Sequence, residues 1–284
     1  MEPFLKWAGG KRWLSAAGIL PEMPTYKRFI EPFLGGGAVF FRYRPPAAII
    51  SDVNEELIEL YKMMRDVPRD LHKKMQRHHE RHSDAYYYKV RAQAPNSPTE
   101  RAARTLYLNR TCWNGLYRVN LAGQFNVPRG TKNTVLFEGE DFEAYSAALQ
   151  TADIRVSDFE LIIDEAKEGD LLFLDPPYTV KHNVNGFIKY NEKLFKWEDQ
   201  IRLRDAVSRA RTRDVSVIMT NADHESVREL YEGVLSYESV SRMSVLAGAA
   251  DARVGTSEAF FTGGILHAAP GASSDHAIGL EGAQ

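Results

Sequence analysis

The sequence predicts an α/β fold: a main domain with a parallel sheet, and an insertion or a small partner unit. The apolar runs 171–174 and 215–219 are typical of buried strands. A strand at 29–33, the loop Leu34-Gly35-Gly36-Gly37 and a helical stretch at 38–43 form the strand–loop–helix arrangement of such folds. At 284 residues the chain is long for one domain, which favours the second unit.

Composition narrows the class of protein. The hydrophobic content of 44% is ample for a core, and no stretch approaches the roughly 20 apolar residues of a membrane span. The first residues lack a basic-then-apolar signal pattern, so we expect no secretion and no membrane partner. Cys112 is the only cysteine, which excludes intramolecular disulfides and cysteine-rich zinc sites. A cytoplasmic protein is expected.

Charge is distributed unevenly along the chain. Residues 61–135 hold 15 Lys and Arg against 5 Asp and Glu, although the whole chain has a net charge of −2. Such a split predicts a basic segment that faces a polyanion, mounted on an acidic body. The alternative is a helical region whose solvated face happens to be basic. We interpret the histidines in this segment (72, 78, 79 and 82) as part of such a solvated face, and expect no metal site.

The first elements carry two loops that suit a small ligand. In Lys6-Trp7-Ala8-Gly9-Gly10-Lys11 the adjacent glycines allow a tight turn or a close approach to a ligand, and a helix is expected at 12–20. Glu31 near the end of the first strand makes the later glycine loop suit a cationic or amino-acid-bearing ligand. The next apolar run, 47–50, ends in Ser51-Asp52, where an acid commonly binds ribose hydroxyls. Asp52 or Asn54 could equally cap a helix at 55–64.

The middle of the chain predicts a helix followed by a reading loop. Ser97-Pro98-Thr99-Glu100 has the pattern of a capping box and starts a helix that runs toward Cys112. The stretch 109–130 then interleaves Asn and Arg with aromatic residues and glycine turns. Arginine and asparagine recognise guanine and adenine edges, and flat rings intrude between bases. A β-hairpin with polar turns is the structural alternative.

Asp175-Pro176-Pro177-Tyr178 follows the buried strand at 171–174 and is the central chemical motif. The prolines end the strand, because neither can donate a ladder hydrogen bond. The motif therefore lies beyond the carboxyl end of a strand, where open α/β sheets hold their ligands. A carboxylate, a fixed carbonyl and an aromatic face are what an exocyclic amine on a flipped-out base requires. A plain turn is the alternative.

The remaining elements complete the sheet. Strands are expected at 154–156, 234–245 and 258–262, and helices at 197–211 and 223–231. The loop at 179–196 has no apolar period and is a candidate lid or DNA-contacting flap. The tail at 268–284, rich in Ala, Gly, Ser and acid, is expected to be disordered.

Five motifs in this order resemble those of the Dam-type, or D12 class, DNA adenine-N6 methyltransferases, over about residues 5 to 261. Their order matches the branch whose recognition domain lies between the donor loop and the catalytic motif. The motifs are Lys6-Trp7-Ala8-Gly9-Gly10-Lys11, Glu31-Pro32-Phe33-Leu34-Gly35-Gly36-Gly37, Asp52-Val53-Asn54, the recognition loop containing Asn114-Gly115-Leu116 and Phe125-Asn126-Val127-Pro128, and Asp175-Pro176-Pro177-Tyr178.

The resemblance implies a Rossmann-like, S-adenosylmethionine-dependent methyltransferase fold with a mixed seven-stranded sheet whose last strand is reversed. Residues 1–57 and 136–267 would form the catalytic domain, and residues 58–135 an inserted helical target-recognition domain. S-adenosylmethionine is the implied methyl donor, double-stranded DNA the implied substrate, and a monomer the implied state. A restriction endonuclease acting on the same DNA is a possible partner in trans.

The resemblance also implies a role for each motif residue. Asp175 and the Pro176 carbonyl would accept hydrogen bonds from the target amine, with Pro177 fixing the turn and Tyr178 stacking on the adenine. Residues implied to bind the donor are Trp7, Ala8, Gly9, Gly10, Lys11, Phe33, Gly35, Gly37, Asp52, Val53, Asp158 and Phe159. Residues implied to bind DNA are Trp113, Asn114, Arg118 and Asn126.

Arg118 matches the arginine that reads the first guanine of a Gua-Ade core in this family, so a GATC-like site is expected. The stretch 246–255 departs from the family, being Ala/Gly-rich where several relatives are more basic, which leaves the outer bases open. A cytosine-N4 or RNA methyltransferase is a rival interpretation, although Asp rather than Ser at position 175 favours adenine. A catalytically idle DNA-binding relative is a further alternative, which the intact donor loop and catalytic motif disfavour. A Rossmann-type oxidoreductase is disfavoured because Gly35-Gly36-Gly37 lacks the Gly-x-Gly-x-x-Gly pattern and nothing pairs with a nicotinamide.

Overall fold

The computed structural model of the chain describes residues 1–11, 24–120, 122–181, 195–243 and 255–264. Within these ranges a seven-stranded sheet has the order β3-β2-β1-β4-β5-β7-β6. The strands β1 to β5 run parallel to one another, whereas β7 is antiparallel to both β5 and β6. The predicted mixed sheet with its reversed last strand is confirmed. The strands are β1 (Arg28–Glu31), β2 (Ala48–Asp52), β3 (Ala152–Val156), β4 (Asp170–Leu174), β5 (Ser216–Ala222), β6 (Ser236–Met243) and β7 (Gly255–Gly263).

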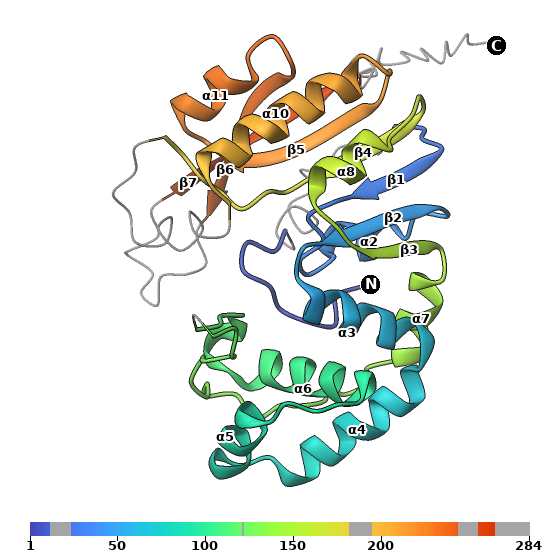
Figure 1. Ribbon diagram of the computed structural model, residues 1–284, viewed down its shortest axis with the longest axis vertical. Helices are drawn as coiled ribbons and strands as arrows, with labels where there is room; N and C mark the ends of the chain where they lie inside the picture. The colour runs from blue at the N-terminus through green and yellow to red at the C-terminus, as the bar shows by residue number, and fades with distance from the viewer. Residues whose placement is uncertain (12–23, 121, 182–194, 244–254, 265–284) are drawn as a thin grey trace, which may run out of the picture.

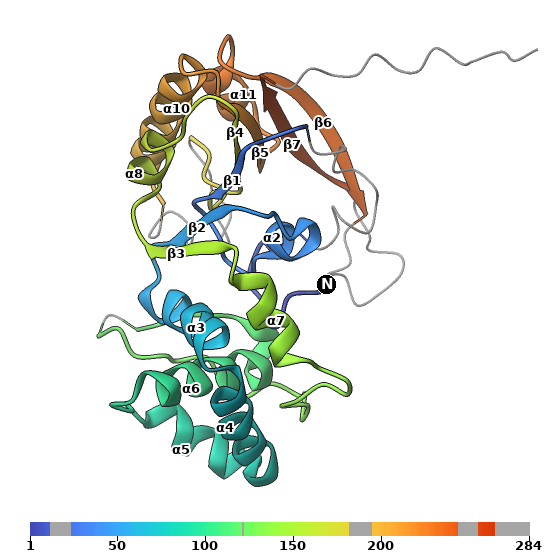
Figure 2. The same ribbon diagram turned by 90° about the vertical axis from the view of Figure 1, so that its right-hand side faces the viewer.

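The central strands are apolar on both faces because helices cover both. Successive residues of a strand point to opposite faces, so Phe29 and Ile30 of β1 enter different hydrophobic clusters. One face is covered by α8 (Phe159–Asp164), α10 (Trp197–Arg211) and α11 (Glu225–Tyr231), and the other by α2 (Ala38–Tyr43) and α3 (Glu55–Asp66) (Figure 2). Such two-sided burial explains the continuous apolar runs that predicted β4 and β5.

Below the sheet lies a helical part made of α4 (Pro68–Arg81), α5 (Asp84–Ala92) and α6 (Pro98–Thr111) (Figure 1). The helices α3 and α7 (Phe142–Leu149) connect it to the sheet, and buried residues of both parts belong to one hydrophobic cluster. α3 packs on α6 and also on β2 and β3. The helical part is therefore packed firmly against the body, and its boundary as a separate domain stays a prediction.

Most predicted elements occur within a residue or two of their expected ends, including the helices at 38–43 and 197–211. Asn54, not Asp52, caps α3 by accepting a hydrogen bond from the Leu57 amide at 3.0 Å. The prediction of a capping box at residues 97–100 was wrong. Helix α6 begins there, but the Ser97 side chain makes no capping hydrogen bond. Glu100 instead forms an ion pair with Lys74 of α4 at 3.1 Å, because tertiary contacts compete with local ones.

The interpretation of the histidines as a purely solvated face was also wrong. The ring of His78 stacks on Tyr107 with centroids 4.7 Å apart, and Nδ1 of His82 lies 2.8 Å from the Tyr107 hydroxyl oxygen. His72 packs against Phe142. Burial, together with nearby Arg81 and Lys74, lowers the pKa of His78 to about 4, so this ring is neutral at neutral pH. These histidines bind helices together.

Asn109 and Arg110, at the start of the predicted reading stretch, are buried structural residues, so their assignment to base reading was wrong. Asn109 donates to the Lys6 carbonyl at 2.6 Å and accepts from the Lys6 amide at 2.9 Å. Arg110 pairs with Glu140 and donates to the carbonyls of Phe4 and Val135. Both side chains therefore fasten the N-terminal segment to α6.

The helix expected at 12–20, the Ala/Gly-rich stretch at 246–255 except its last residue, the tail, and most of the loop at 179–196 lie outside the described residues. Among the described helices, none combines the length and the apolar character needed to cross a bilayer.

Candidate active site

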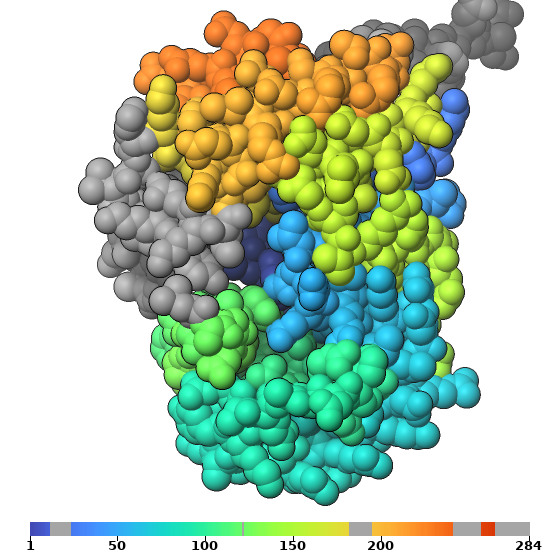
Figure 3. All heavy atoms as spheres, in the orientation of Figure 1, coloured from blue at the N-terminus to red at the C-terminus, as the bar shows by residue number. Residues whose placement is uncertain are grey.

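A cavity of about 350 Å³ opens where the parallel strands end. The space-filling view shows the dark blue N-terminal segment in a hollow between the sheet and the helical part (Figure 3). Each predicted donor-binding and catalytic residue lines this cavity, although they come from five separate stretches of the chain. They are Trp7, Ala8, Gly9, Gly10, Lys11, Phe33, Gly35, Gly37, Asp52, Val53, Asp158, Phe159, Asp175, Pro176, Pro177 and Tyr178.

The glycine loop after β1 is shaped by Trp7 and held by Asp52. Gly35 has φ +46°, and a Cβ placed there would lie 2.8 Å from the Trp7 side chain, so no larger residue fits. The Asp52 carboxylate accepts the Gly35 amide at 3.0 Å and the Asn54 amide at 3.0 Å. Burial raises the pKa of Asp52, while these amides act in the opposite direction. Asp52 thus fixes the loop and faces the cavity.

Aromatic rings line the part of the cavity nearest α8. Phe33 stacks on Phe159 with centroids 5.3 Å apart, and Phe195 lies edge-on to Phe33 at 5.8 Å. Asp158 caps α8 through the Glu160 amide at 2.9 Å and pairs with Arg202 at 2.8 Å. The surface suits a flat, apolar ring with polar edges, such as a purine.

Glu31 is a buried acid at the end of β1 that faces the cavity. Within the described part of the chain its Oε2 atom is buried without a hydrogen-bond partner. Burial raises the pKa of Glu31 well above its usual value, and the nearby Asp175 raises it further. A buried, unsatisfied carboxylate oxygen is costly, so this position favours a ligand that brings an N–H donor or a positive charge.

Asp175 lies at the centre of a polar cluster beyond β4. Its Oδ1 atom accepts the Thr220 hydroxyl at 2.8 Å and pairs with Lys11 Nζ at 3.0 Å. Burial raises the pKa of Asp175, whereas Lys11 and Thr220 counteract this. These contacts fall on Oδ1, and the ammonium stabilises the ionised carboxylate.

Tyr178 and Glu258 complete the cluster. The Tyr178 hydroxyl donates to Oε2 of Glu258 at 2.8 Å, and Lys11 Nζ lies 3.5 Å from the same oxygen. Lys11 also lies over the Tyr178 ring, 4.6 Å from its centroid. Burial and the two carboxylates raise the pKa of Tyr178 well above its usual value, so its hydroxyl remains a neutral donor.

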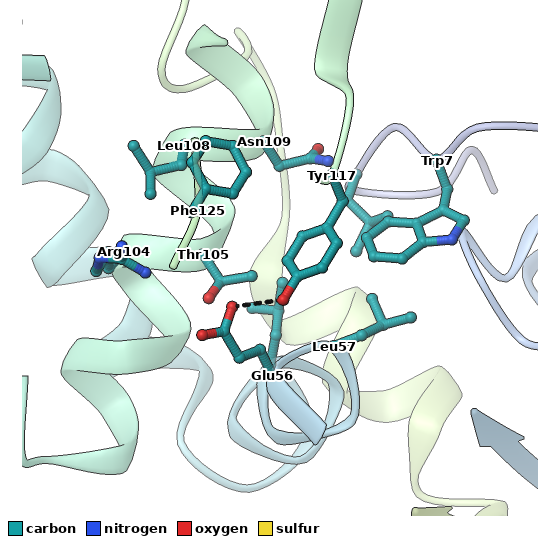
Figure 4. A pocket seen from close by; sticks show the side chains of 11 residues that line it. Trp7, Glu56, Leu57, Arg104, Thr105, Leu108, Asn109, Tyr117 and Phe125 are labelled. Atoms are coloured by element: carbon teal, nitrogen blue, oxygen red, sulfur yellow. Dashed lines mark hydrogen bonds between the residues drawn. The ribbon is translucent and has the colours of Figure 1, made fainter. Parts of the chain in front are cut away.

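A small pocket beside the cavity joins the N-terminal segment, α3 and the recognition loop, residues 113–129 (Figure 4). Trp7 stacks on Tyr117 with centroids 5.3 Å apart, and the Tyr117 hydroxyl donates to Glu56 of α3 at 2.9 Å. Tyr117 also lines the main cavity. The recognition loop is therefore attached to the wall of the active site.

The four predicted DNA-binding residues lie outside the cavity lining, on the recognition loop. Trp113 is 51% exposed, and Asn114 is exposed with a left-handed backbone, φ +54°. Arg118 is exposed and donates from Nε to Oδ1 of Asn126 at 2.8 Å. Bridges between residues 119 and 125 and between 112 and 129 give the loop the character of an irregular hairpin. Their reading roles stay predictions.

Several residues of the site were missed by sequence reasoning. Thr220 and Glu258 lie on strands whose apolar pattern predicted structure only. Tyr117 lies in the predicted reading stretch and Phe195 in the predicted loop at 179–196, but neither was assigned a role in the site. Glu258 gave the one usable signal, since an acid within the apolar strand sequence Glu258-Ala259-Phe260-Phe261 is buried at a cost. Lys11 was expected to bind the donor; it lines the cavity, its ammonium pairs with two carboxylates, and its donor-binding role stays a prediction.

Comparison with known proteins agrees with this site. A family model described as D12 class N6 adenine-specific DNA methyltransferase matches residues 7–246. A type II methyltransferase of Lactococcus lactis subsp. cremoris is 39% identical over 243 residues, which cover 82% of this chain and 85% of the relative.

Two further relatives come from distant organisms. A type II methyltransferase of Methanocaldococcus jannaschii is 34% identical over 257 residues, covering 82% of this chain and 89% of the relative. A protein named DNA adenine methylase from Haemophilus influenzae is 34% identical over 238 residues, covering 81% of this chain and 83% of the relative. The matched region contains the cavity-lining motifs from Trp7 to Tyr178.

Proposed function

Since the chain belongs to the D12 class of N6 adenine-specific DNA methyltransferases, we propose that it moves a methyl group from S-adenosylmethionine to an adenine flipped out of a short duplex site. The observation that carries the proposal is the single cavity that brings the donor-loop residues and Asp175 to Tyr178 together. Ligands of open α/β sheets bind at this edge.

The residues of the cavity fit S-adenosylmethionine. The unsatisfied Oε2 of Glu31 suits a cationic ammonium, and Asp52 at the end of β2 suits ribose hydroxyls. The stacked Phe33 and Phe159 suit the adenine ring. The bound donor would supply an electrophilic methyl group on a sulfonium.

The catalytic motif prepares the acceptor amine. Among the described residues the side-chain contacts of Asp175 use Oδ1, so Oδ2 is suited to accept one amine proton and the Pro176 carbonyl the other. Two such hydrogen bonds draw the nitrogen toward sp³ character and expose its lone pair. Tyr178 offers a ring face on which the adenine stacks.

The recognition loop supports a GATC-like target. Arg118 is held by Asn126 in a fixed orientation, as a residue that reads one guanine edge requires. Trp113 is exposed at the start of the loop, where a ring can contact bases beside the flipped one. A monomer working on cytoplasmic DNA, with or without a partner endonuclease, remains our expectation.

Transfer of a labelled methyl group tests the function. S-adenosylmethionine and short duplexes with or without GATC are the substrates, and single-stranded RNA and adenine-free DNA are the controls. Incorporation only into GATC duplexes is expected. Incorporation into other adenine-containing duplexes would contradict the GATC assignment. Incorporation into RNA or adenine-free DNA would contradict the assignment of adenine in duplex DNA as the methyl acceptor.

Asp175→Ala tests the catalytic assignment. Removing the carboxylate takes away the acceptor of the target amine, so transfer should fall by at least 100-fold while calorimetry shows nearly unchanged donor affinity. Substantial remaining transfer would remove Asp175 from the mechanism. Thermal unfolding of the variant controls for loss of the fold.

A further inference from the structure

We propose that Glu258, on the reversed strand β7, is a positioning residue for methyl transfer. Its carboxylate holds the Tyr178 ring and the Lys11 ammonium, and through them sets the place and charge of Asp175. The inference rests on the proposed function, because it concerns the same reaction.

The reversed strand brings Glu258 to the active edge. In the antiparallel register of β5 and β7, Glu258 pairs with Ala222, the last residue of β5. A parallel strand would deliver the residues at its end to this edge, whereas an antiparallel strand delivers those near its start. Glu258 is the fourth residue of β7 as the structure bounds it, and its side chain reaches Tyr178 beyond β4. The reversed strand thus adds a carboxylate to Glu31 and Asp52, which the parallel strands β1 and β2 deliver to this edge.

Glu258 and Asp175 share one cation. Among the described residues, three oxygens lie within 3.5 Å of Lys11 Nζ: the Gly9 carbonyl at 3.0 Å, Asp175 Oδ1 at 3.0 Å and Glu258 Oε2 at 3.5 Å. An ammonium has three N–H donors, so its position is fixed from three sides. Lys11 is only 3% exposed, and water competes little for these contacts. The strength of the Lys11–Asp175 pair therefore depends on Glu258.

Glu258 also fixes the aromatic face. A tyrosine ring on a short turn can tilt about its two side-chain torsions, and a hydrogen bond from its hydroxyl removes that freedom. The Tyr178 hydroxyl donates to Glu258 at 2.8 Å, and Lys11 lies against the ring. The ring is thereby set before the adenine arrives. A ring that is already in position stabilises the transition state of methyl transfer more than it stabilises the bound substrate.

A purely structural role does not account for this carboxylate. Glu258 is 7% exposed on a strand whose next residues, Ala259, Phe260 and Phe261, are buried and apolar. Burying an acid there costs free energy that an apolar residue would not. The carboxylate lies at Tyr178 and Lys11, both of which line the cavity.

Glu258→Gln separates positioning from stability, because glutamine keeps the shape and one acceptor but loses the charge. We expect kcat for methyl transfer to fall by about 10-fold or more, with donor affinity from calorimetry changed less than about twofold. The acid limb of the kcat–pH profile should also move to lower pH. Removing the Glu258 charge lowers the pKa of Asp175, since Glu258 is one cause that raises it.

The assignment of that limb depends on every group around Asp175. Tyr178 stays neutral and Thr220 does not titrate in this range, so within the described part of the chain Glu31 is the other acid whose proton affects the limb. Glu31→Gln is measured beside Glu258→Gln, and only the shift that persists in the Glu31→Gln background is assigned to Glu258. Among residues 1–11, 24–120, 122–181, 195–243 and 255–264, the groups that face Asp175 are Lys11, Glu31, Tyr178, Thr220 and Glu258.

The variant Tyr178→Phe tests whether Glu258 acts through the Tyr178 hydroxyl. If Glu258 acts through Tyr178 and Lys11, the double variant Tyr178→Phe/Glu258→Gln should lose less than the product of the two single losses. Glu238→Gln, an exposed acid on the neighbouring strand β6, is the matched control and should resemble the wild type.

Each outcome decides the proposal. An unchanged kcat, an unmoved acid limb or fully multiplicative losses would overturn the role of Glu258. Glu258→Asp, which keeps the charge and withdraws it by one methylene, should recover the pH profile, and thermal unfolding of the variant controls for loss of the fold. Wild-type transfer to adenine DNA in the same assay tests the proposed function independently.

Discussion

At the residue scale, folding buries the carboxyl group of Glu31, and this burial costs free energy when the group is ionised. Because burial and Asp175 raise its pKa, the native chain holds the Glu31 proton more tightly than the unfolded chain does. The contribution of this proton binding to the stability of the fold is fully present below the pKa of Glu31 in the unfolded chain, about 4.3. It is lost as the pH rises toward the raised pKa of the folded chain.

Glu31→Gln should therefore stabilise the donor-free protein increasingly with pH. Glutamine has no proton to lose, so its advantage in melting temperature should be small near pH 4 and larger near pH 8. Thermal unfolding at both pH values measures this, with the exposed Glu229→Gln as control. An advantage independent of pH would contradict the raised pKa. Under the proposed function, in which Glu31 accepts the donor ammonium, Glu31→Gln should also weaken donor binding.

Arg118→Ala tests the reading of sequence. Removing the Arg118 guanidinium group, which Asn126 holds, should reduce the discrimination between guanine and other bases at one position by about 1–3 kcal/mol. Relative kcat/KM values on duplexes that differ at single positions measure it. The exposed Lys132→Ala should instead weaken binding to all sequences alike. An unchanged preference in Arg118→Ala would remove this residue from recognition.

Residues within short motifs could be predicted from the sequence, whereas those supplied by distant strands could not. Asp175 and Tyr178 follow a strand within a motif, and each donor residue beside a glycine loop is similarly marked. Thr220 and Glu258 reach the site only because β5 lies next to β4 in the sheet and β7 lies next to β5. Strand order is a long-range property that local patterns do not contain.

At the scale of elements, an aromatic contact and a hydrogen bond of Tyr117 help to attach the recognition loop to the body. Tyr117 joins Trp7 of the N-terminal segment to Glu56 of α3. Tyr117→Phe keeps the stacking but deprives the partly buried Glu56 of its donor, so we expect a loss of about 1–2 kcal/mol in the free energy of unfolding. Urea denaturation measures it.

The exposed Tyr88→Phe is the control for Tyr117→Phe and should be neutral, because Tyr88 is 45% exposed. Equal stability of the two variants would show that the Tyr117–Glu56 hydrogen bond contributes nothing measurable.

Helices and strands with a strong sequence pattern were predicted more reliably than the side-chain contacts at their ends. Helix α6 occurs where the proline and acid indicated a start, yet its expected capping box is replaced by the Lys74–Glu100 ion pair. Arg110 resembles a reading residue in sequence but is buried by the N-terminal segment. In both cases a partner far along the chain displaces the local interaction.

At the scale of the whole molecule, much of the positive charge of residues 61–135 is neutralised internally. Acids compensate several of its basic side chains, some of them from outside the segment. The pairs are Arg65–Asp66, Arg69–Glu143, Lys73–Asp70, Lys74–Glu100, Arg101–Glu59, Arg110–Glu140 and Arg129–Asp84. The overall charge split was visible in the sequence, but not this compensation.

DNA affinity should consequently fall with salt, less steeply than 15 free cations would imply. Each phosphate contact contributes a slope of about −0.9 in a plot of log affinity against log salt concentration. Fluorescence anisotropy across a salt series measures the slope. A flat response would exclude the basic segment as the DNA-binding surface, and Arg209→Gln on α10, outside the segment, should leave the slope unchanged.

Lys11 and Glu258 meet in one cluster although they stand near opposite ends of the sequence. A break in the backbone between residues 12 and 174 would leave Lys11 on one fragment and both carboxylates on the other. Fragments cut between β2 and β3 would have to reunite through the β1–β4 and β2–β3 pairings before a methyl group could move. DNA methylation would then be a lasting chemical record that two separately produced halves had met.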